Sequence, residues 1–269
     1  MSDLLINDNG RLVRQDIISQ TQGYNTSERY IPIPTQSVLD IIKEVEPDYK
    51  IVGFNNANVR KADKQSFQKH ALMINLKDEL IAEVAKPNLI IFNSSDRSMA
   101  LKIYIGYISM ACSNQCVAGT NIMEPISIRH TDKNWKHTIY SLMNEYESYK
   151  EKLESNIINM KEKYVSYGDQ GMFIEEAVNT IINPNIEGEI LDPLQFNNAN
   201  RKEDTGKTLY KLMQRFQENM VKGGIKRIIE KTDDNNKLFT SISNTHVIKD
   251  NKKLIKMNQD LHNLATNML

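Results

Sequence analysis

The chain has 269 residues, of which 40% are hydrophobic and 25% are charged, and its 34 basic and 34 acidic residues give zero formal net charge. This composition is ordinary for a globular protein of one large or two small domains, and zero net charge excludes nucleic-acid binding driven by the whole-protein field. Two cysteines are too few for a disulfide scaffold, and no apolar run resembles a signal peptide or a bilayer span, which predicts a cytoplasmic protein.

The N-terminal part reads as an arm followed by a helix. Residues 1–29 are polar and irregular, Asn9–Gly10 predicts a turn, and Pro32 and Pro34 bracket an extended piece. Thr35 looks like a helix N-cap, and apolar residues recur with helical spacing from Val38 to Val45. Pro47 predicts the end of this helix, because the residue before a proline avoids the helical conformation.

Three short strands are predicted next, at residues 49–54, 67–76 and 88–92, of which the third is short and β-branched. Residues 99–112 are apolar except for Lys102. A helix that is apolar on all sides is usually buried, so we predict a buried central helix here. Residues 125–130 then predict a strand that returns to the edge of the sheet.

The C-terminal half is predicted to be mostly helical. Apolar residues from Trp135 to Tyr164 alternate spacings of four and three, which predicts a long helix packed lengthwise on a partner. We favour a partner within the same chain over a coiled-coil oligomer. Gly168 and Gly171 predict a break, and further helices are expected at 173–182, at 204–222 and after Asp250, whereas 238–247 is ambiguous.

These elements predict an α+β fold, in which a small antiparallel sheet packs on a buried central helix and the C-terminal half is mostly helical. The predicted division is an N-terminal arm (1–34), a β-β-β-α-β core (35–133) and a helical region (134–269) packed on that core as one compact unit.

The sequence gives little evidence for a catalytic site. The loop from Asn93 to Asp96 could hold an anion through backbone N–H groups at a helix start, or it could simply cap that helix. A nucleophilic Cys112 would need a base within reach, and nothing in its spacing to His130 supports one. The residues Cys112, Cys116, His130 and His137 match no standard zinc pattern. We therefore predict no catalytic residue, metal or cofactor, and an enzyme that uses Cys112 or the Asn93 loop is only a third alternative.

Basic residues are more suggestive, because they gather in three groups that could form one groove for a phosphate backbone, with tyrosines, Phe54 or Phe67 stacking bases. The alternative is a set of solvated helix faces balanced by interleaved acids such as Glu203 and Glu218. Bare backbone N–H groups at Gly223–Gly224 beside lysines make the strongest local case. The predicted nucleic-acid-binding residues are Arg60, Lys61, Lys64, Lys69, Arg97, Arg129, Arg201, Lys202, Arg215, Lys222, Gly223, Gly224, Lys226 and Arg227.

Two stretches, residues 92–130 and 192–227, together carry the motifs of a known protein family. The first has Asn93-Ser94-x-Asp96 before the apolar segment and Arg129-His130 on the returning strand, and the second has Gln217-Glu218-Asn219 before Gly223-Gly224. In this order the chain resembles the phage/plasmid-like protein family, domain-of-unknown-function family 932, over most of residues 35–269. Ser95-Asp96-Arg97 stands where that family usually has His-Asp-Gly, and the missing histidine weakens any metal or acid–base role for the loop.

The resemblance implies an origin in mobile elements of bacteria, and hence the cytoplasm of a bacterial host. The predicted β-β-β-α order is similar to the core of phage single-strand annealing proteins, although fold alone does not give function. We therefore predict a phage- or plasmid-encoded protein of recombination type that binds or anneals single-stranded DNA without catalysis and forms homo-oligomers. The alternative is a host-directed anti-defence or other protein-interaction factor that binds through the Tyr-rich long helix.

Overall fold

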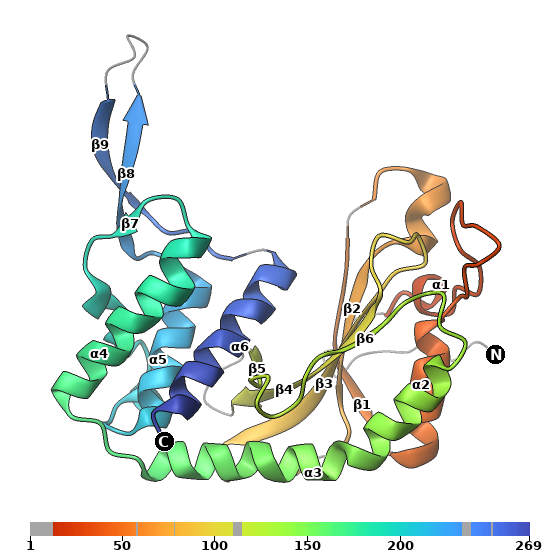
Figure 1. The fold of residues 1–269 in the computed structure, drawn as a ribbon, viewed down its shortest axis with the longest axis horizontal. Coiled ribbons are helices and arrows are strands. Elements are labelled where there is room, and N and C mark those ends of the chain that lie inside the picture. Colours follow the sequence, from red (N-terminus) through yellow and green to blue (C-terminus); the bar gives the residue numbers. More distant parts are fainter. Residues whose placement is uncertain (1–12, 58, 78, 110–114, 233–237, 249) are drawn as a thin grey trace. The chain divides into compact units, whose positions relative to one another are not determined.

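In the computed structural model the chain packs as two compact units (Figure 1), and the described residues are 13–57, 59–77, 79–109, 115–232, 238–248 and 250–269. Unit 1 comprises residues 1–110 and 123–152, and unit 2 comprises residues 111–122 and 153–269. The boundary falls within helix α3 (Trp135–Glu162), whereas the sequence-based division placed it at residue 134. The turn predicted at Asn9–Gly10, and Cys112 with its neighbours, lie outside the described residues.

Unit 1 is built on an antiparallel sheet flanked by helices (Figure 1). Its elements are helices α1 (Gln15–Ile18) and α2 (Thr35–Val45), strands β1 (Lys50–Asn56), β2 (His70–Asn75), β3 (Ala85–Asn93), β4 (Leu101–Ser109) and β6 (Ile126–Ile128), and the first part of α3. The strands pair in the order β1-β2-β3-β4, and β6 pairs with β4. The three predicted strands and the returning strand are therefore confirmed, with shifted bounds.

The predicted central helix is wrong, because Leu101–Ser109 forms strand β4. Most side chains of β4 are buried, with the sheet partners β3 and β6 on its two sides. A strand that is buried on both faces reads as a continuous apolar run, which periodicity cannot distinguish from a buried helix. The α+β class is confirmed nonetheless, since antiparallel sheets are combined with a largely helical C-terminal half.

The long predicted helix is confirmed as α3, and its apolar stripe is buried inside the chain. The stripe residues Trp135, Ile139, Leu142, Tyr146, Leu153, Ile157 and Met160 are each 6% exposed or less. Tyr164 lies beyond the end of the helix and is 61% exposed. A partner within the same chain therefore covers most of the stripe, including Tyr146, whereas Tyr149 is half-buried.

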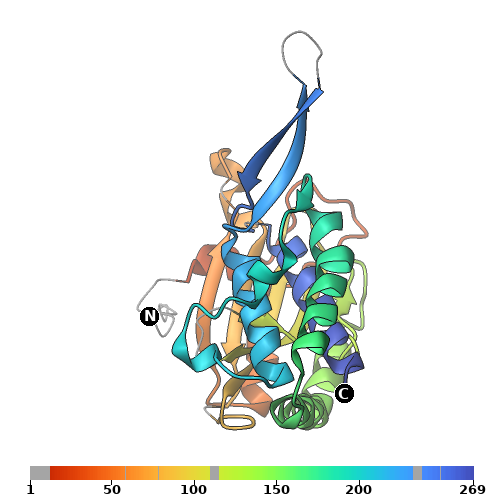
Figure 2. The same ribbon diagram turned by 90° about the vertical axis from the view of Figure 1, so that its left-hand side faces the viewer.

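Unit 2 combines helices with a second sheet (Figure 2). Its elements, besides the end of α3, are β5 (Gln115–Val117), α4 (Tyr167–Ala177), β7 (Glu189–Ile190), α5 (Leu209–Lys222), β8 (Lys226–Thr232), β9 (Leu238–Asn244) and α6 (Asn251–Asn267). A single π-helical turn, Val178–Ile182, extends α4. Strands β8 and β9 form a long antiparallel ribbon whose far end projects beyond the helices of this unit (Figure 2).

Helix boundaries in unit 2 test several predictions. The predicted break after the long helix falls at residues 163–166, and Gly168 and Gly171 lie inside α4, because Ser166 and Asp169 form a capping box that starts α4 ahead of both glycines. Gly223 ends α5 with φ +69, as predicted, and Asp250 caps α6 by accepting from the amides of Lys252 and Lys253. In the part of the chain that the structure describes, none of the helices is long and apolar enough to cross a membrane.

Candidate nucleic-acid interface

One end of the unit 1 sheet gathers the predicted basic residues of this unit. At this end β1 finishes opposite the start of β2 (Asn56 with His70), and β2 starts opposite the finish of β3 (His70 with Asn93). The start of β4 lies opposite the finish of β6 (Leu101 with Ile128). The β1–β2 connection, the β3–β4 loop and the segment after β6 must therefore emerge side by side.

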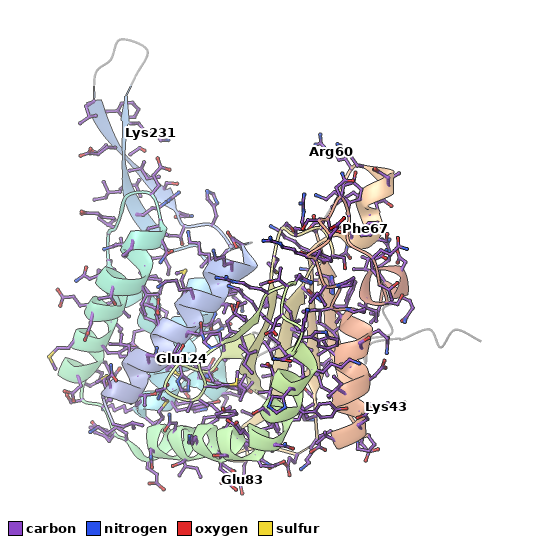
Figure 3. The ribbon with its side chains drawn as sticks, turned by 45° about the vertical axis from the view of Figure 1, so that its right-hand side comes forward. Lys43, Arg60, Phe67, Glu83, Glu124 and Lys231 are labelled. Atoms are coloured by element: carbon purple, nitrogen blue, oxygen red, sulfur yellow. The ribbon has the colours of Figure 1, made fainter. Side chains whose placement is uncertain are left out.

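These segments carry what we call the sheet-end basic cluster, which consists of Arg60, Lys61, Lys64, Lys69, Arg97 and Arg129. All six side chains are exposed except that of Lys64, which is half-buried. Figure 3 shows Arg60 and Phe67 together at this end, far from Glu83 in the β2–β3 connection at the other end of the sheet. Three separate stretches of sequence thus place cations on one surface of unit 1.

The β3–β4 loop was predicted to start a helix, and the structure corrects this, because Ser94–Ala100 joins two antiparallel strands. The loop is held from within: the Ser94 hydroxyl accepts from the amide of Met99 at 3.1 Å, and Asp96 accepts from the amide of Ser98 at 3.0 Å. Arg97 adopts φ +64, a left-handed conformation that side chains other than glycine seldom take. This turn presents the Arg97 side chain to solvent.

A contact between the two loops fixes one member of the cluster. Lys64 forms an ion pair with Asp96 at 2.8 Å, and the Ser95 amide donates to the carbonyl of Phe67 at 3.0 Å. Burial alone would raise the pKa of Asp96, but hydrogen bonds from Lys64 and Ser98 outweigh it, so this pKa is lowered and the carboxylate stays charged. Lys64 is therefore neutralised, and five cations of the cluster remain for a ligand.

Aromatic rings lie beside these cations. The rings of Tyr24 and Phe67 are 5.4 Å apart between centroids, and the Lys64 ammonium lies 5.9 Å from the Tyr24 centroid. Both rings are half-buried, so each keeps part of its surface open to solvent. Tyr24 is held by a 2.8 Å hydrogen bond from its hydroxyl to Asp63. Phe67 was among the predicted base-stacking residues, whereas Tyr24 comes from the N-terminal arm, which sequence reasoning had left without a role.

A buried chain of hydrogen bonds supports this end of the sheet. Asn93 donates to the carbonyl of Ile33 at 2.7 Å and to the Thr35 hydroxyl at 3.0 Å, and its side-chain oxygen lies 3.1 Å from His130 Nε2. The Thr35 hydroxyl lies 2.7 Å from His70 Nε2. Thr35 was predicted to cap α2, but Pro34 occupies that position and the Thr35 hydroxyl serves this chain instead.

The bonding pattern defines the histidine tautomers. His70 Nδ1 faces the carbonyl of Gln68 at 3.2 Å, which can only accept, so Nδ1 carries the proton and Nε2 accepts from Thr35. Since the Thr35 hydroxyl donates to His70, it accepts from Asn93, whose oxygen then accepts from His130 Nε2–H. Burial lowers the pKa of His70 to about 4 and also lowers the pKa of His130. Both imidazoles are therefore neutral at pH 7.

Acidification is expected to destabilise unit 1. The folded pKa of His70 lies below the unfolded value of about 6.5, so stability is full above that pH and falls as the pH drops towards 4. Between pH 7 and pH 5 the loss from His70 should be about 2 kcal/mol, to which His130 adds. Urea denaturation followed by fluorescence of the single tryptophan, Trp135 in unit 1, measures it.

Two variants separate this effect from general acid sensitivity. His70→Asn removes one titrating group and should reduce the loss of stability between pH 7 and pH 5 by about 2 kcal/mol, whatever its cost at pH 7, which leaves the part due to His130. His137→Gln alters an exposed histidine of the same unit and should leave the dependence as in the wild type. An unchanged pH dependence in His70→Asn would contradict the assignment.

In unit 2, Arg201 and Arg215 are occupied by protein partners. Arg201 binds Asp204 at 2.6 Å and Glu218 at 3.0 Å, and these two carboxylates are 1% and 0% exposed. Arg215 is 4% exposed and donates to the carbonyls of Asp204 and Gly206 at 2.8 and 2.9 Å. Both guanidinium groups are therefore engaged by protein groups, so we leave both out of the interface.

The glycine pair is also occupied, which corrects the expected anion site there. The Gly223 amide donates to the carbonyl of Asn219 at 3.0 Å, and the Gly224 amide donates to Thr245 at 2.9 Å. A Cβ atom on Gly223 would lie 2.7 Å from the backbone of His246, so this glycine permits a close backbone approach. Arg227 is buried and donates to the carbonyl of Glu187 at 2.7 Å. The three lysines predicted beside them, Lys202, Lys222 and Lys226, are exposed, and Lys222 is paired with Glu218.

Sequence reasoning missed the chain that joins Thr35, His70, Asn93 and His130. These residues are spread over almost a hundred positions. Asn93 was considered only as part of an anion-binding or capping loop, and His130 only as a base or a zinc ligand. Among the described residues, no group of three or more His, Cys, Asp or Glu side chains is placed to hold a metal ion. The hydrogen bonds among Thr35, His70, Asn93 and His130 can hold the neighbouring loops in place without a charged group. The sheet-end basic cluster on those loops can attract anions.

Comparison of the sequence with known proteins finds relatives whose function is not characterised. A family model described as "Domain of unknown function (DUF932)" matches residues 25–243. The UPF0380 protein YfjQ of Escherichia coli (strain K12) is 24% identical over 214 residues, which are 78% of this chain and 74% of that protein. The UPF0380 protein YafZ of the same strain is 24% identical over 218 residues, with the same shares covered. No solved structure matches the chain.

Proposed function

The chain belongs to the DUF932 family, and because that family is described as a domain of unknown function, we propose from the site itself that the protein binds single-stranded DNA, without catalysis, through the sheet-end basic cluster. The observation that carries the proposal is the meeting of basic residues from three chain segments beside the Tyr24–Phe67 ring pair. Cations that follow a phosphate backbone together with rings that stack on bases are typical of single-strand binding.

The arrangement favours a single strand over a duplex. The cluster is carried by loops and by a short 3₁₀ helix, Ala62–Phe67, which are too irregular to enter a major groove as a helix or a ribbon would. Tyr24 and Phe67 can stack only on bases that are unpaired and exposed. An annealing protein of a mobile element would need such a surface, since it must hold the backbone and leave base edges free to pair.

Salt dependence gives the first test. Each phosphate neutralised on a single strand contributes about −0.7 to the slope of log affinity against log salt concentration. The five cations left after Lys64 pairs with Asp96 therefore predict a slope of at most about −3.5. Fluorescence anisotropy with a labelled oligothymidine at several salt concentrations measures it, and an affinity indifferent to salt would overturn the proposal.

Charge removal gives the second test. The double variant Arg97→Gln/Arg129→Gln should lose about 1.4 units of slope and bind on the order of 25-fold more weakly at 0.1 M salt. The control Lys43→Gln/Lys152→Gln removes the same charge from exposed helix positions of unit 1 away from the sheet-end basic cluster. An equal loss in both double variants would show that binding follows net charge and not this surface.

A further inference from the structure

The β8–β9 ribbon ends in an unprotected edge. The second sheet has the order β7-β8-β9, so β9 pairs with β8 on one side, and no strand of the described residues pairs with its other side. Its sequence, Leu238 to Asn244, contains no charged residue and no proline. Edge strands usually carry lysine, proline or a bulge that blocks pairing with another chain, and β9 has neither residue.

One face of the same ribbon carries exposed apolar side chains. Ile228 of β8 lies directly opposite Ile242 of β9, and Leu238 points to the same face because it is four residues from Ile242. These side chains are 37%, 66% and 63% exposed respectively. The neighbouring cross-strand pair on this face, Glu230 with Thr240, is polar, and its charged member belongs to β8. The stripe therefore continues up to the free edge of β9.

We propose that β9 pairs antiparallel with β9 of a second copy of the chain, about a two-fold axis at Thr240. In this register Leu238 of each copy lies opposite Ile242 of the other. The stripe then runs from Ile228 through Ile242 to Leu238 of the second copy, on one face of a six-stranded sheet that includes β7 of both copies. Cross-strand apolar pairs of this kind are the unit of sheet stabilisation.

Charge and self-complementarity favour a second copy as the occupant. The two β8 strands, which carry Lys226, Glu230 and Lys231, would be separated by both β9 strands, or about 14 Å at the usual strand spacing. Like charges at that distance are screened at physiological salt, because the Debye length is about 8 Å. A strand from another protein could also bind this edge, but the strand that matches the spacing of Leu238 and Ile242 is β9 itself.

The β9–β9 contact should be weak and should stop at a dimer. A seven-residue strand buries less area than a standard interface, so we expect dissociation in the micromolar range. A two-fold contact uses the same surface on both partners and stops at a dimer. The proposal does not depend on DNA binding, since the sheet-end basic cluster lies in unit 1 and the ribbon lies in unit 2.

Sedimentation velocity of the full chain over micromolar concentrations tests the contact. The wild type should show a concentration-dependent dimer, and Ile242→Lys should raise the dimer dissociation constant by at least about tenfold, because it places a charge at the centre of the stripe. The matched control is Met172→Lys, at a residue of α4 that is 63% exposed, and it should dimerise as the wild type does. A monomeric wild type, or a dimer indifferent to Ile242→Lys, overturns the proposal.

Disulfide trapping tests the register. Thr240→Cys puts the two introduced thiols opposite each other across the axis, within the 4.4–6.8 Å Cα separation that a disulfide needs. Oxidation should therefore give a covalent dimer whose linked peptide, identified by mass spectrometry, contains residue 240 in both copies. Leu238→Cys places its thiol opposite Ile242 and should not cross-link. Efficient trapping of Leu238→Cys, or none of Thr240→Cys, would rule out this register.

Discussion

Replacing Arg201 with methionine is expected to lower the free energy of unfolding of unit 2 by about 3–5 kcal/mol. The guanidinium binds Asp204 through Nε at 2.9 Å and Nη2 at 2.6 Å, and it also pairs with Glu218 at 3.0 Å. Both carboxylates are buried, so methionine would leave Asp204 and one side of Glu218 as uncompensated charges in a medium that solvates them poorly. Lys222 still reaches Glu218 but is itself largely exposed.

The measurement must report on unit 2 separately, because a chain of two units need not unfold in one step. Hydrogen exchange of peptides from α5 does so, and their protection should fall by the same free energy in Arg201→Met. The adjacent variant Lys202→Met removes one charge from an exposed residue and should change the stability by less than about 0.5 kcal/mol. Equal protection of α5 in the two variants would mean that Arg201 contributes no more than an ordinary surface cation.

Arg201 illustrates why the basic residues could not be sorted from the sequence. Arg201 and Lys202 are neighbours of like charge, yet Lys202 is exposed, whereas Arg201 is half-buried and bound to the buried carboxylates of Asp204 and Glu218. The polar side of α5 is buried as completely as its apolar side, with Glu218 0% and Gln214 1% exposed. The expected solvated face is therefore an internal network, whose partners come from residues 170 and 197–206.

Strand β4 shows the same limit for the fold. Its apolar run was assigned to a helix because strands buried on both faces lose the alternation that identifies exposed strands. Composition carried the missing signal, since Ile103, Ile105 and Ile108 are β-branched and Tyr104 and Tyr107 are aromatic, the residue types that strands favour. By contrast α3 was predicted to within two residues, because its buried stripe extends over seven turns of regular spacing.

The exposed cations of the candidate site could be predicted from the sequence, whereas the buried contacts beneath them could not. Exposed cations in loops, such as Arg60 and Lys61, need only local sequence to be recognised, and strand pairing then brought them close to Arg97 and Arg129. The support beneath them depends on contacts between residues distant in sequence, and nothing local marks Thr35 as a partner of His70. Charge patterns therefore indicated the surface, whereas the polar contacts that hold it required the structure.

Replacing Asn93 with alanine is expected to lower the free energy of unfolding of unit 1 by about 3–5 kcal/mol, because a buried hydrogen-bond network would be broken at its centre. The side chain of Asn93, in a residue 1% exposed, serves both the Ile33 carbonyl and the Ser94 amide, at 2.7 and 2.9 Å. Each buried group left unpaired costs about 1–3 kcal/mol. Alanine would leave these two unpaired together with His130 Nε2–H.

Urea denaturation followed by Trp135 fluorescence measures this loss in unit 1, where Trp135 is 6% exposed. The control Asn55→Ala makes the same change at an exposed position of β1 and should cost less than about 0.5 kcal/mol. His130→Phe adds a second constraint, since it removes the donor to Asn93 but keeps a ring to stack on Tyr30, which lies 5.0 Å away between centroids. If the Asn93 network couples these residues, the double variant Asn93→Ala/His130→Phe should cost less than the sum of the single variants. Additive losses would mean that the Asn93 side chain supports the loop only through its hydrogen bonds to the backbone groups of Ile33 and Ser94, and not through His130.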